Sequence, residues 1–545
     1  MYAFLKMADD INGEKPRLID TGRGFSIFYR GIYLYSQYNP KKNIIQHIDS
    51  LQIPESTLLL CFSPILDYGL RQLIDKTPQN SFVLGLEYDQ MLMRISMDTY
   101  DSALLNSNRF AYVRTDTIAE LLKKIEHVPS YPFKHCITLT CSAAVQLHQD
   151  FYTNAKHSVD EHLARFWINR LTLIQLGRNY QHNIFRNLST FLETDKCYFL
   201  HGTEKIQKPL LVAGAGPSLD SARSFIIQNR QAFFLLAVDA AATALLPEIQ
   251  PDAIVLLESQ YWIDSAFIGL VKSGIPLFAD LTSSAHVIRS FSKPIYFFCT
   301  EYTKSSCLQD MYDHFQVLKL EPMGSVGLTA IQLALQLSNA PAPIFYTGLD
   351  FSWGKGLTHA RSSSPVKKLY GTLQRTYPCY ALNFPFQVQS LIGKNNAPAW
   401  ATANLISYAQ LYQHAFAHNN RIIDIRTEGI PLTSYCASYD EAAHTLIHTS
   451  HSPMPHFFNA ALQKKEKKLI FLYLKSEYNT LTALVHHLEG TQPIPQQDFT
   501  HILQHKDYLY NHFPDAEHGY RPELHFLKRI RIEITATLKI ISRLF

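Results

Sequence analysis

The residues with the clearest potential for chemistry lie at 210–220, where the chain reads LLVAGAGPSLD. The apolar start is typical of a buried strand, and Gly214 and Gly216 make a turn in which the backbone can pass close to a ligand. Pro217 and Ser218 fit the first turn of a helix, where a proline loses no hydrogen bond. The free N–H groups and positive dipole end of such a helix form a seat for phosphate. Because the third glycine of the dinucleotide fingerprint is absent, the stretch predicts an anion site without naming the ligand.

Further polar residues follow other apolar runs in the same part of the chain. They are Asp239, Glu258, Asp280, Gly348 and Asp350, while Gly324 and Ser325 open a helical pattern. In a parallel sheet the carboxyl ends of the strands meet at one edge, and ligands bind outside that edge. A single acid at a strand end is often only a helix cap. Several acids that converge with two Gly/Ser helix starts favour a nucleotide pocket.

A regular alternation of strand and helix patterns is expected to position these residues. Strands are predicted at 210–213, 232–238, 253–257, 276–279, 295–299, 317–320 and 344–347. Helices are predicted at 217–229 and 240–246, and from Gly324 through Leu337. This order is typical of a Rossmann-like, doubly wound α/β domain with several parallel strands.

Four domains are expected along the chain. They are a smaller α/β domain at 1–150, a helical connector at 151–205, the central Rossmann-like domain at 206–432 and a helical domain at 433–545. Basic runs in the last domain, at 464–468 and 528–531, indicate either a docking surface or a solvated helix face.

The first of these domains contains a βαβ pattern with two possible meanings. Strand-like runs at 57–62 and 81–86 flank a helix candidate at 67–75. Glu87 follows the second run, where Rossmann-like domains often hold a ribose. The turn after the first run has no glycine before Gly69. The pattern is therefore either a nucleotide site or a parallel sheet whose turn binds nothing, and the second interpretation is favoured.

The composition excludes several classes of protein. A net charge of +4 over 545 residues gives no sign of a dedicated nucleic-acid binder. Eight cysteines are scattered without a CxxC pair, which predicts buried thiols in a reducing compartment. The N-terminal residues lack the apolar region of a signal peptide. The longest apolar run, 232–246, is too short to span a bilayer. A cytoplasmic protein without a membrane span is expected.

Several short motifs resemble those of a known enzyme family. The sequence AGAGPSL at 213–219 resembles the AGxGPSL motif of the motility-associated-factor (Maf) flagellin glycosyltransferases and of bacterial CMP-sialic-acid-dependent sialyltransferases. The GSV helix start at 324–326, GLDFSW at 348–353 and THA at 358–360 are similar to further Maf motifs. The resemblance spans most of residues 20–432.

This resemblance implies a reaction and a set of site residues. A nonulosonic acid (pseudaminic, legionaminic or sialic-type) would pass from its CMP-activated form to Ser or Thr of flagellin in the cytoplasm, for flagellar assembly and motility. The residues expected to bind the donor are Gly214, Ala215, Gly216, Pro217, Ser218, Asp239, Glu258, Gly324, Ser325 and Gly348. The acceptor hydroxyl needs a base, for which His359 is the first candidate and Asp350 the second. His359 has the alternative role of ordering the turn that contains it.

The chain also departs from the sialyltransferase pattern. A catalytic histidine is expected near 398–402, where this sequence has Ala399-Trp400-Ala401. Ala215 and Asp239 stand where those enzymes often have asparagine. No DxD metal motif occurs in the central domain, so the reaction is expected to need no cofactor, with the role of a divalent metal left open. Two alternatives are a pyrophosphate transfer like that of pterin diphosphokinases and a flagellin-binding assembly factor without activity.

Overall fold

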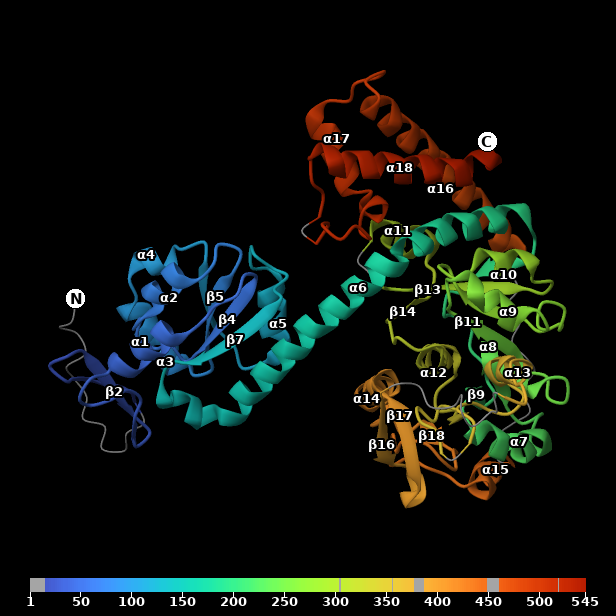
Figure 1. The fold of residues 1–545 in the computed structure, drawn as a ribbon, viewed down its shortest axis with the longest axis horizontal. Helices are drawn as coiled ribbons and strands as arrows, with labels where there is room; N and C mark the ends of the chain where they lie inside the picture. Colours follow the sequence, from blue (N-terminus) through green and yellow to red (C-terminus); the bar gives the residue numbers. More distant parts are fainter. Residues whose placement is uncertain (1–14, 303–304, 355, 377–386, 448–459, 518) are drawn as a thin grey trace. The chain divides into compact units, whose positions relative to one another are not determined.

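The computed structural model describes residues 15–302, 305–354, 356–376, 387–447, 460–517 and 519–545. The chain divides into two compact units, Met1–Thr172 and Leu173–Phe545, and each is described by itself (Figure 1). Most of the N-terminal stretch without a predicted signal peptide lies outside the described residues, as does Cys379.

The first unit contains a parallel sheet in the order β6-β5-β4-β7. Its strands are β4 (Thr57–Phe62), β5 (Phe82–Glu87), β6 (Phe110–Arg114) and β7 (His135–Thr140). The helices are α1 (Lys42–Ser50), α2 (Leu70–Lys76), α3 (Gln90–Thr99), α4 (Ser102–Leu105) and α5 (Ile118–Glu126). An antiparallel sheet of β1 (Arg17–Asp20), β2 (Phe25–Tyr29) and β3 (Ile32–Tyr33) precedes them. The predicted βαβ unit is confirmed, because continuous apolar runs such as TLLLCF suit strands buried on both faces.

Glu87 lies at the carboxyl edge of this sheet, with its carboxylate occupied by the chain itself. The Ser63 hydroxyl donates to Oε2 at 2.6 Å. Oε1 accepts from the backbone N–H groups of Tyr88 and Asp89 and from the Tyr152 hydroxyl. Burial raises the pKa of Glu87 to about 7. A carboxylate with these partners has little capacity left for a ribose, which favours the interpretation of a sheet whose turn binds nothing.

The second unit is organised around a parallel sheet in the order β14-β13-β12-β11-β10-β9-β15-β18, with β8 also paired to β13. The strands are β8 (Cys197–Phe199), β9 (Leu210–Ala213), β10 (Phe234–Val238), β11 (Ala253–Leu256), β12 (Leu277–Asp280), β13 (Ile295–Thr300), β14 (Lys319–Leu320), β15 (Ile344–Thr347) and β18 (Ile422–Asp424). From β9 the chain adds strands β10 to β14 on one side, and then adds β15 and β18 on the other side of β9. In open α/β sheets such a switch point is where ligands bind.

Helices connect these strands, including the three that the sequence predicts at 217–229, 240–246 and 324–337. They are α7 (Ser218–Gln228), α8 (Asp239–Leu245), α9 (Asp264–Phe267), α10 (Ala285–Ser290), α11 (Ser306–Phe315), α12 (Val326–Leu337), α13 (Ser364–Gly371) and α14 (Ala403–Phe416). Of these, α12 packs against β9, β10 and β15 at the centre of the sheet. The predicted doubly wound α/β fold is confirmed.

Three features of the second unit are absent from the sequence prediction. Strand β8 follows a long helix directly and is too short to show a period of its own. Strand β18 is equally short. An antiparallel hairpin of β16 (Val388–Ile392) and β17 (Pro398–Thr402) also lies between α13 and α14.

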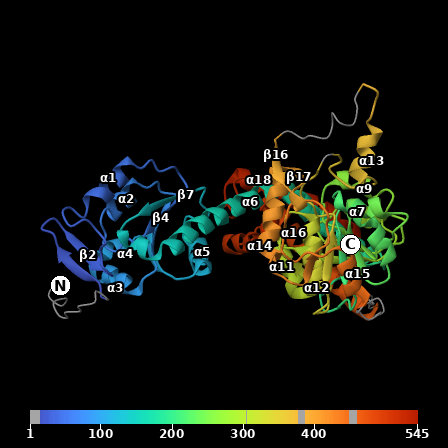
Figure 2. The ribbon, with the colours of Figure 1, turned by 90° about the horizontal axis from the view of Figure 1, so that it is seen from below.

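Long helices account for the regions in which helical patterns were predicted. Helix α6 (Gln149–Glu193) is drawn as one continuous ribbon (Figure 1, Figure 2). The C-terminal region contains α15 (Tyr439–Ile447), α16 (Ala460–Leu488), α17 (Gln496–Gln504) and α18 (Leu524–Ile541). Buried residues of α16 and α18 belong to the same hydrophobic core as the strands of the large sheet. The domain boundaries at 150, 205 and 432 stay predictions.

Two observations bear on the expected compartment. Cys61, Cys141, Cys197, Cys299 and Cys307 are buried and unpaired, but Cys136 is half-buried and Cys436 is exposed. The prediction of buried thiols is therefore wrong for Cys436, which lies in a loop after β18. In the described parts of the chain, no helix combines the length and the apolar character needed to cross a membrane.

Candidate functional site

The glycine-rich loop after β9 lies directly against the loop after β15. The Gly214 N–H donates to the Thr347 carbonyl at 2.8 Å, and the Gly216 N–H donates to the Gly348 carbonyl at 2.7 Å. A Cβ on Gly214 would collide with the Gly348 carbonyl, and one on Gly216 would collide with the Asp350 carboxylate. Gly348 itself has a φ of +70°, which few other residues adopt. The glycines are thus explained by the close approach of two loops, whereas the sequence suggested the approach of a ligand.

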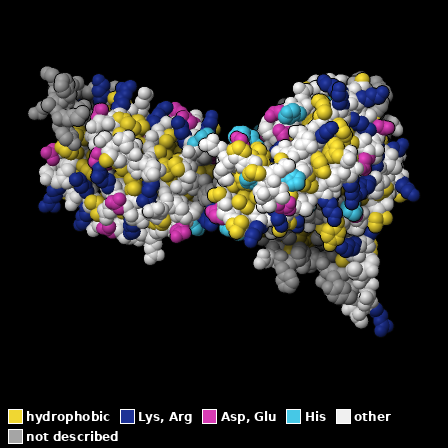
Figure 3. Space-filling view, turned by 90° about the horizontal axis from the view of Figure 1, so that it is seen from above, with side chains coloured by type: hydrophobic (Ala, Val, Ile, Leu, Met, Phe, Trp, Pro, Cys, Tyr) yellow, Lys and Arg dark blue, Asp and Glu magenta, His cyan; other side chains and the backbone are white. Residues whose placement is uncertain are grey.

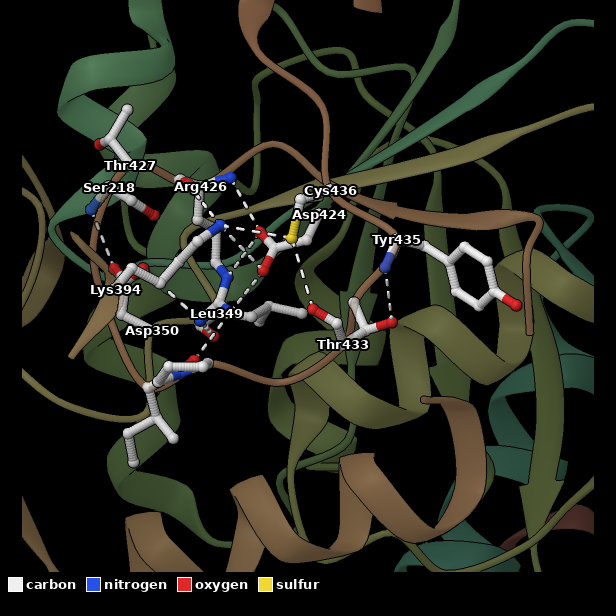
Figure 4. Close-up of polar contacts among 12 residues, drawn as sticks. Ser218, Leu349, Asp350, Lys394, Asp424, Arg426, Thr427, Thr433, Tyr435 and Cys436 are labelled. Atoms are coloured by element: carbon white, nitrogen blue, oxygen red, sulfur yellow. Dashed lines mark hydrogen bonds and ion pairs between the residues drawn. The ribbon is translucent and has the colours of Figure 1, made fainter. Parts of the chain in front are cut away.

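Asp350 occupies the position that was predicted to hold a phosphate (Figure 4). Its Oδ2 accepts a hydrogen bond of 2.8 Å from the Ser218 N–H, in the first turn of α7. The Ser218 hydroxyl in turn accepts from the Gly348 N–H at 2.9 Å. Asp350 is only 1% exposed. The protein therefore supplies the negative charge at the start of α7. Because the Asp350 carboxylate is buried, an acceptor hydroxyl has no access to it.

A buried arginine, Arg426, supports the loop after β15 through hydrogen bonds and charge (Figure 4). Arg426 forms two hydrogen bonds with Asp424, of which the shorter is 2.7 Å, and donates to the Leu349 carbonyl at 2.7 Å. Its Nη1 lies 4.0 Å from Asp350 Oδ1. Lys394 Nζ adds a second positive charge 3.2 Å from Asp424 Oδ2. The sequence gave no motif for Arg426, Asp424 or Lys394, because short strands and a hairpin bring them together.

The two carboxylates beside Arg426 have opposite pKa shifts. Burial raises the pKa of Asp350 to about 6, and the positive charge of Arg426 opposes this effect only in part. For Asp424, burial also acts to raise the pKa, but Arg426 and Lys394 outweigh it and the pKa is lowered. Asp424 is therefore ionised at neutral and mildly acidic pH, whereas Asp350 becomes protonated as the pH falls through about 6.

His359 lies in a turn that is attached to the glycine loop. The next residue, Ala360, donates its N–H to the Ala215 carbonyl at 2.8 Å. Arg361 donates its N–H to the Asp220 carboxylate of α7 at 3.0 Å. His359 is half-buried, with the Thr358 hydroxyl 3.0 Å from Nδ1. Burial lowers the pKa of His359, so the ring is neutral at pH 7 and able to accept a proton.

Two half-buried acids continue the same edge of the sheet. Asp239 begins α8 and accepts from the Ala240 N–H at 2.6 Å, while Glu258 accepts from the Gln260 N–H at 2.9 Å. Burial, and then the negative charge of Glu258, raise the pKa of Asp239 to about 6. They follow β10 and β11, the first and second neighbours of β9 on that side. At about 4.8 Å between strands, β11 lies about 10 Å from β9.

Asp280, at the next strand end, has a structural role. Its Oδ1 accepts from the N–H and hydroxyl of Thr282, and its Oδ2 accepts from the Thr300 N–H at 2.7 Å. Two asparagines of α6, which sequence reasoning missed, fix the neighbouring loops. Asn183 donates to the carbonyls after β11 and β12, and Asn187 donates twice to the loop after β12.

The start of α12 is an accessible helix N-terminus at this edge. Gly324, with a φ of +66°, is exposed, and Ser325 is half-buried with extended backbone. The Thr329 N–H bonds back to Ser325, which leaves the preceding N–H groups without an intrahelical partner. Gly327 of the same turn packs against Leu349 of the β15 loop. This places the start of α12 beside the switch point and makes it the better seat for an anion.

No group of three or more His, Cys, Asp or Glu side chains suited to a metal ion occurs among the described residues. Asp239 and Glu258 are two neighbouring carboxylates, a number that Mg²⁺ usually supplements with water and substrate phosphates. This edge of the sheet thus carries helix N–H groups at the start of α12 and a neutral histidine in a turn that follows β15.

Comparison with known proteins agrees with this architecture. Residues 182–356 match the family model described as 6-hydroxymethylpterin diphosphokinase MptE-like. An uncharacterized protein of Treponema pallidum (strain Nichols) is 38% identical over 554 aligned residues, which cover 98% of this chain and 96% of that protein. The solved structure of the Maf glycosyltransferase from Magnetospirillum magneticum AMB-1 is similar with a TM-score of 0.55. That similarity covers 99% of this chain and 92% of the other, at 13% identity.

The similarity to the Magnetospirillum structure extends over nearly the whole chain, beyond the central motifs that carried the predicted resemblance. At this level of identity it establishes the fold. The chain thus has the fold of a Maf glycosyltransferase, and it belongs to the same protein family as the Treponema pallidum protein.

Proposed function

We propose that the protein is a glycosyltransferase that moves a nonulosonic acid from its CMP-activated donor to Ser or Thr of a protein acceptor. The observation that carries the proposal is the similarity to the Maf glycosyltransferase fold, combined with an accessible helix start and a neutral histidine at the switch point. The motifs at 213–219, 348–353 and 358–360 support the same class of donor. Flagellin is the acceptor that the Maf resemblance favours, with the reaction taking place in the cytoplasm.

The donor phosphate is best accommodated at the start of α12. Gly324 and Ser325 would bind it through backbone N–H groups and the Ser325 hydroxyl, which are polarised by the helix dipole. The glycine loop, Gly214 to Ser218, would form the wall beside it, with its own helix start already occupied by Asp350. Asp239 and Glu258 would face the sugar, where negative charge stabilises an oxocarbenium-like carbon.

The reaction needs one proton acceptor, and His359 suits that role better than Asp350. The acceptor hydroxyl oxygen attacks the anomeric carbon of the sugar, and His359 takes its proton. The bond between that carbon and the phosphate oxygen breaks, and its electron pair leaves with CMP. Asp350 is enclosed and holds the Ser218 N–H, so we assign it a positioning role.

A second candidate function is the transfer of pyrophosphate from ATP. The match of residues 182–356 to a diphosphokinase-like family model favours it. That model covers the core of the second unit only, whereas the similarity to the glycosyltransferase structure covers 99% of the chain. The third possibility, a flagellin-binding assembly factor without activity, requires no nucleotide binding at all.

Calorimetric titration with CMP, and then with ATP and Mg²⁺, separates these functions. A Ser325→Asp variant keeps a favourable helix cap but places a negative charge at the anion seat, and Ser325→Asn is its neutral match. We expect CMP to bind the wild-type protein and Ser325→Asn, and to bind Ser325→Asp about tenfold more weakly or worse. Binding of ATP but not CMP would establish the diphosphokinase alternative. Binding of neither would leave the assembly factor.

A further inference from the structure

Three arginines of the second unit come together without an acidic partner. They are Arg186 of α6, Arg289 of α10 and Arg543 of the 3₁₀ turn η6 (Ser542–Leu544), called the arginine cluster below. Arg186 is half-buried, while Arg289 and Arg543 are exposed. In the parts of the chain that the structure describes, no hydrogen bond or ion pair joins any of the three guanidinium groups to a carboxylate.

The packing of α18 along α6 explains how Arg543 reaches Arg186. Arg178 donates to Glu533 at 3.1 Å, and Gln181 donates to Thr537 at 2.9 Å. This part of α6 and α18 therefore run parallel and side by side, and η6 follows α18 directly. About six residues beyond Thr537, at 1.5 Å per residue, the chain is level with Arg186.

Arg289 approaches from the other side. Lys196 donates to the Arg289 carbonyl at 2.9 Å, which ties α10 to the chain just after α6. The pKa of Arg186 is lowered by burial and then by the positive charges of Arg289 and Arg543, and no acid counteracts them. Like charges held this close, and left unpaired, are an unfavourable arrangement that an anionic partner would relieve.

Exposed apolar side chains lie beside the cluster. Phe545, two residues after Arg543, packs its ring 5.4 Å from that of Phe471 of α16 and is itself 47% exposed. Phe471 and Leu472 are 40% and 52% exposed. On the face seen in Figure 3, Lys and Arg side chains of the second unit are interspersed with hydrophobic ones.

The composition of this surface indicates the kind of partner. Arginine and aromatic residues are enriched in the contact regions of protein–protein interfaces. A free phosphate would leave the exposed rings of Phe471 and Phe545 uncovered. The net charge of +4 gives no sign of a dedicated nucleic-acid binder. Lys196 precedes β8 and Arg289 precedes β13, at the amino edge of the sheet. Arg186 lies nearer the carboxyl edge, because its neighbours Asn183 and Asn187 donate to the loops after β11 and β12.

We propose that the arginine cluster, together with Phe471 and Phe545, binds an acidic amphipathic segment of a partner protein. The carboxylates of that segment would pair with the guanidinium groups, which bind carboxylates in a bidentate manner. Its apolar side chains would cover the rings. This interaction uses none of the residues assigned to the proposed transfer reaction.

A labelled synthetic helix of about 20 residues, with Glu on one face and Leu on the other, is a suitable probe for the full-length protein. Fluorescence anisotropy would compare wild-type protein with the triple variant Arg186→Gln, Arg289→Gln, Arg543→Gln. A matched control removes three exposed cations of the first unit by Arg94→Gln, Lys123→Gln and Lys124→Gln. Circular dichroism melting would establish that each variant is folded.

We expect the triple variant to bind the peptide about tenfold more weakly, with the control unchanged. Phe545→Ser should weaken binding as well, because the peptide loses an apolar contact. Equal binding by wild-type protein and the triple variant, or no binding to either, would overturn the proposal. The proposal would also fail if pyrophosphate or a short DNA strand displaced the peptide and Phe545→Ser left peptide binding unchanged. That combination would describe a phosphate site without an apolar contact.

Discussion

The side chains of His359 and Asp350 differ in what surrounds them. Asp350 is nearly inaccessible and already accepts the Ser218 N–H, whereas His359 is half-buried in a turn anchored on Ala215. A proton acceptor must come within hydrogen-bond reach of the group that it deprotonates. At the scale of single residues, therefore, burial supports the proposed order of the two candidate bases, with His359 first and Asp350 second.

For His359→Ala we expect transfer to fall by about 10²- to 10⁴-fold while CMP binding is retained, because the base is lost but the anion seat is intact. In the wild-type protein burial lowers the pKa of His359, so the ring becomes protonated, and unable to accept a proton, only at a pH below the ordinary imidazole range. Activity should be flat above neutral pH and decline in acid. Mass spectrometry of the acceptor measures the product.

His418→Ala, an exposed histidine after α14, is the matched control and should leave transfer unchanged. If His359→Ala retained full transfer, the turn histidine would have only an ordering role. The acid decline should also be absent from any residual activity of His359→Ala, since the titrating group is gone.

At the scale of elements, the loops after β9 and β15 are joined by backbone hydrogen bonds, so that a change in one loop displaces the other. Gly214→Ala introduces a Cβ that collides with the backbone of Gly348, so the two loops must separate. We expect the free energy of unfolding to fall by about 1–3 kcal/mol and CMP binding to weaken, as measured by urea denaturation and calorimetry. Gly269→Ala is the control, because nothing lies within 4 Å of that added carbon. Similar stability of the two variants would contradict the tight contact.

The elements also show what could be predicted from the sequence. Strands β4, β9 and β15 occupy the predicted bounds, since their apolar runs are bounded by clear turn residues. Strands β8 and β18 have only three residues each, too few for a periodic pattern. The polar residues at the strand ends were found from their position alone. Arg426 was missed because its role depends on Asp424 and Asp350, which tertiary packing brings to it.

At the scale of the molecule, the C-terminal helices are part of the second unit. Ile470 and Leu474 of α16 and Ile530 of α18 are fully buried in the core that contains the large sheet. Gln463 donates to the carbonyls of Asp195 and Cys197, which ties α16 to β8. The sequence suggested a separate helical domain at 433–545, and this packing favours a single folding unit from Leu173 onward.

Removal of residues 460–545 should therefore expose the core of the second unit. We expect the shortened chain to be insoluble, or to lose its cooperative unfolding transition, because the apolar residues that α16 and α18 cover would face water. Solubility and thermal melting by circular dichroism are the measurements. A soluble product with an unchanged melting transition would support an independent C-terminal domain.

The carboxylate of Asp350 at the start of α7 has a consequence for the thermodynamics of ligand binding. Because the protein supplies its own anion there, the loops of Gly214–Ser218 and Gly348–Asp350 are ordered before any ligand arrives. Ordering a flexible loop costs conformational entropy, and a loop that is already fixed spares the ligand that cost. In the proposed reaction, selectivity at this edge would therefore come from the fit of the donor to these fixed loops, rather than from a loop that closes around it.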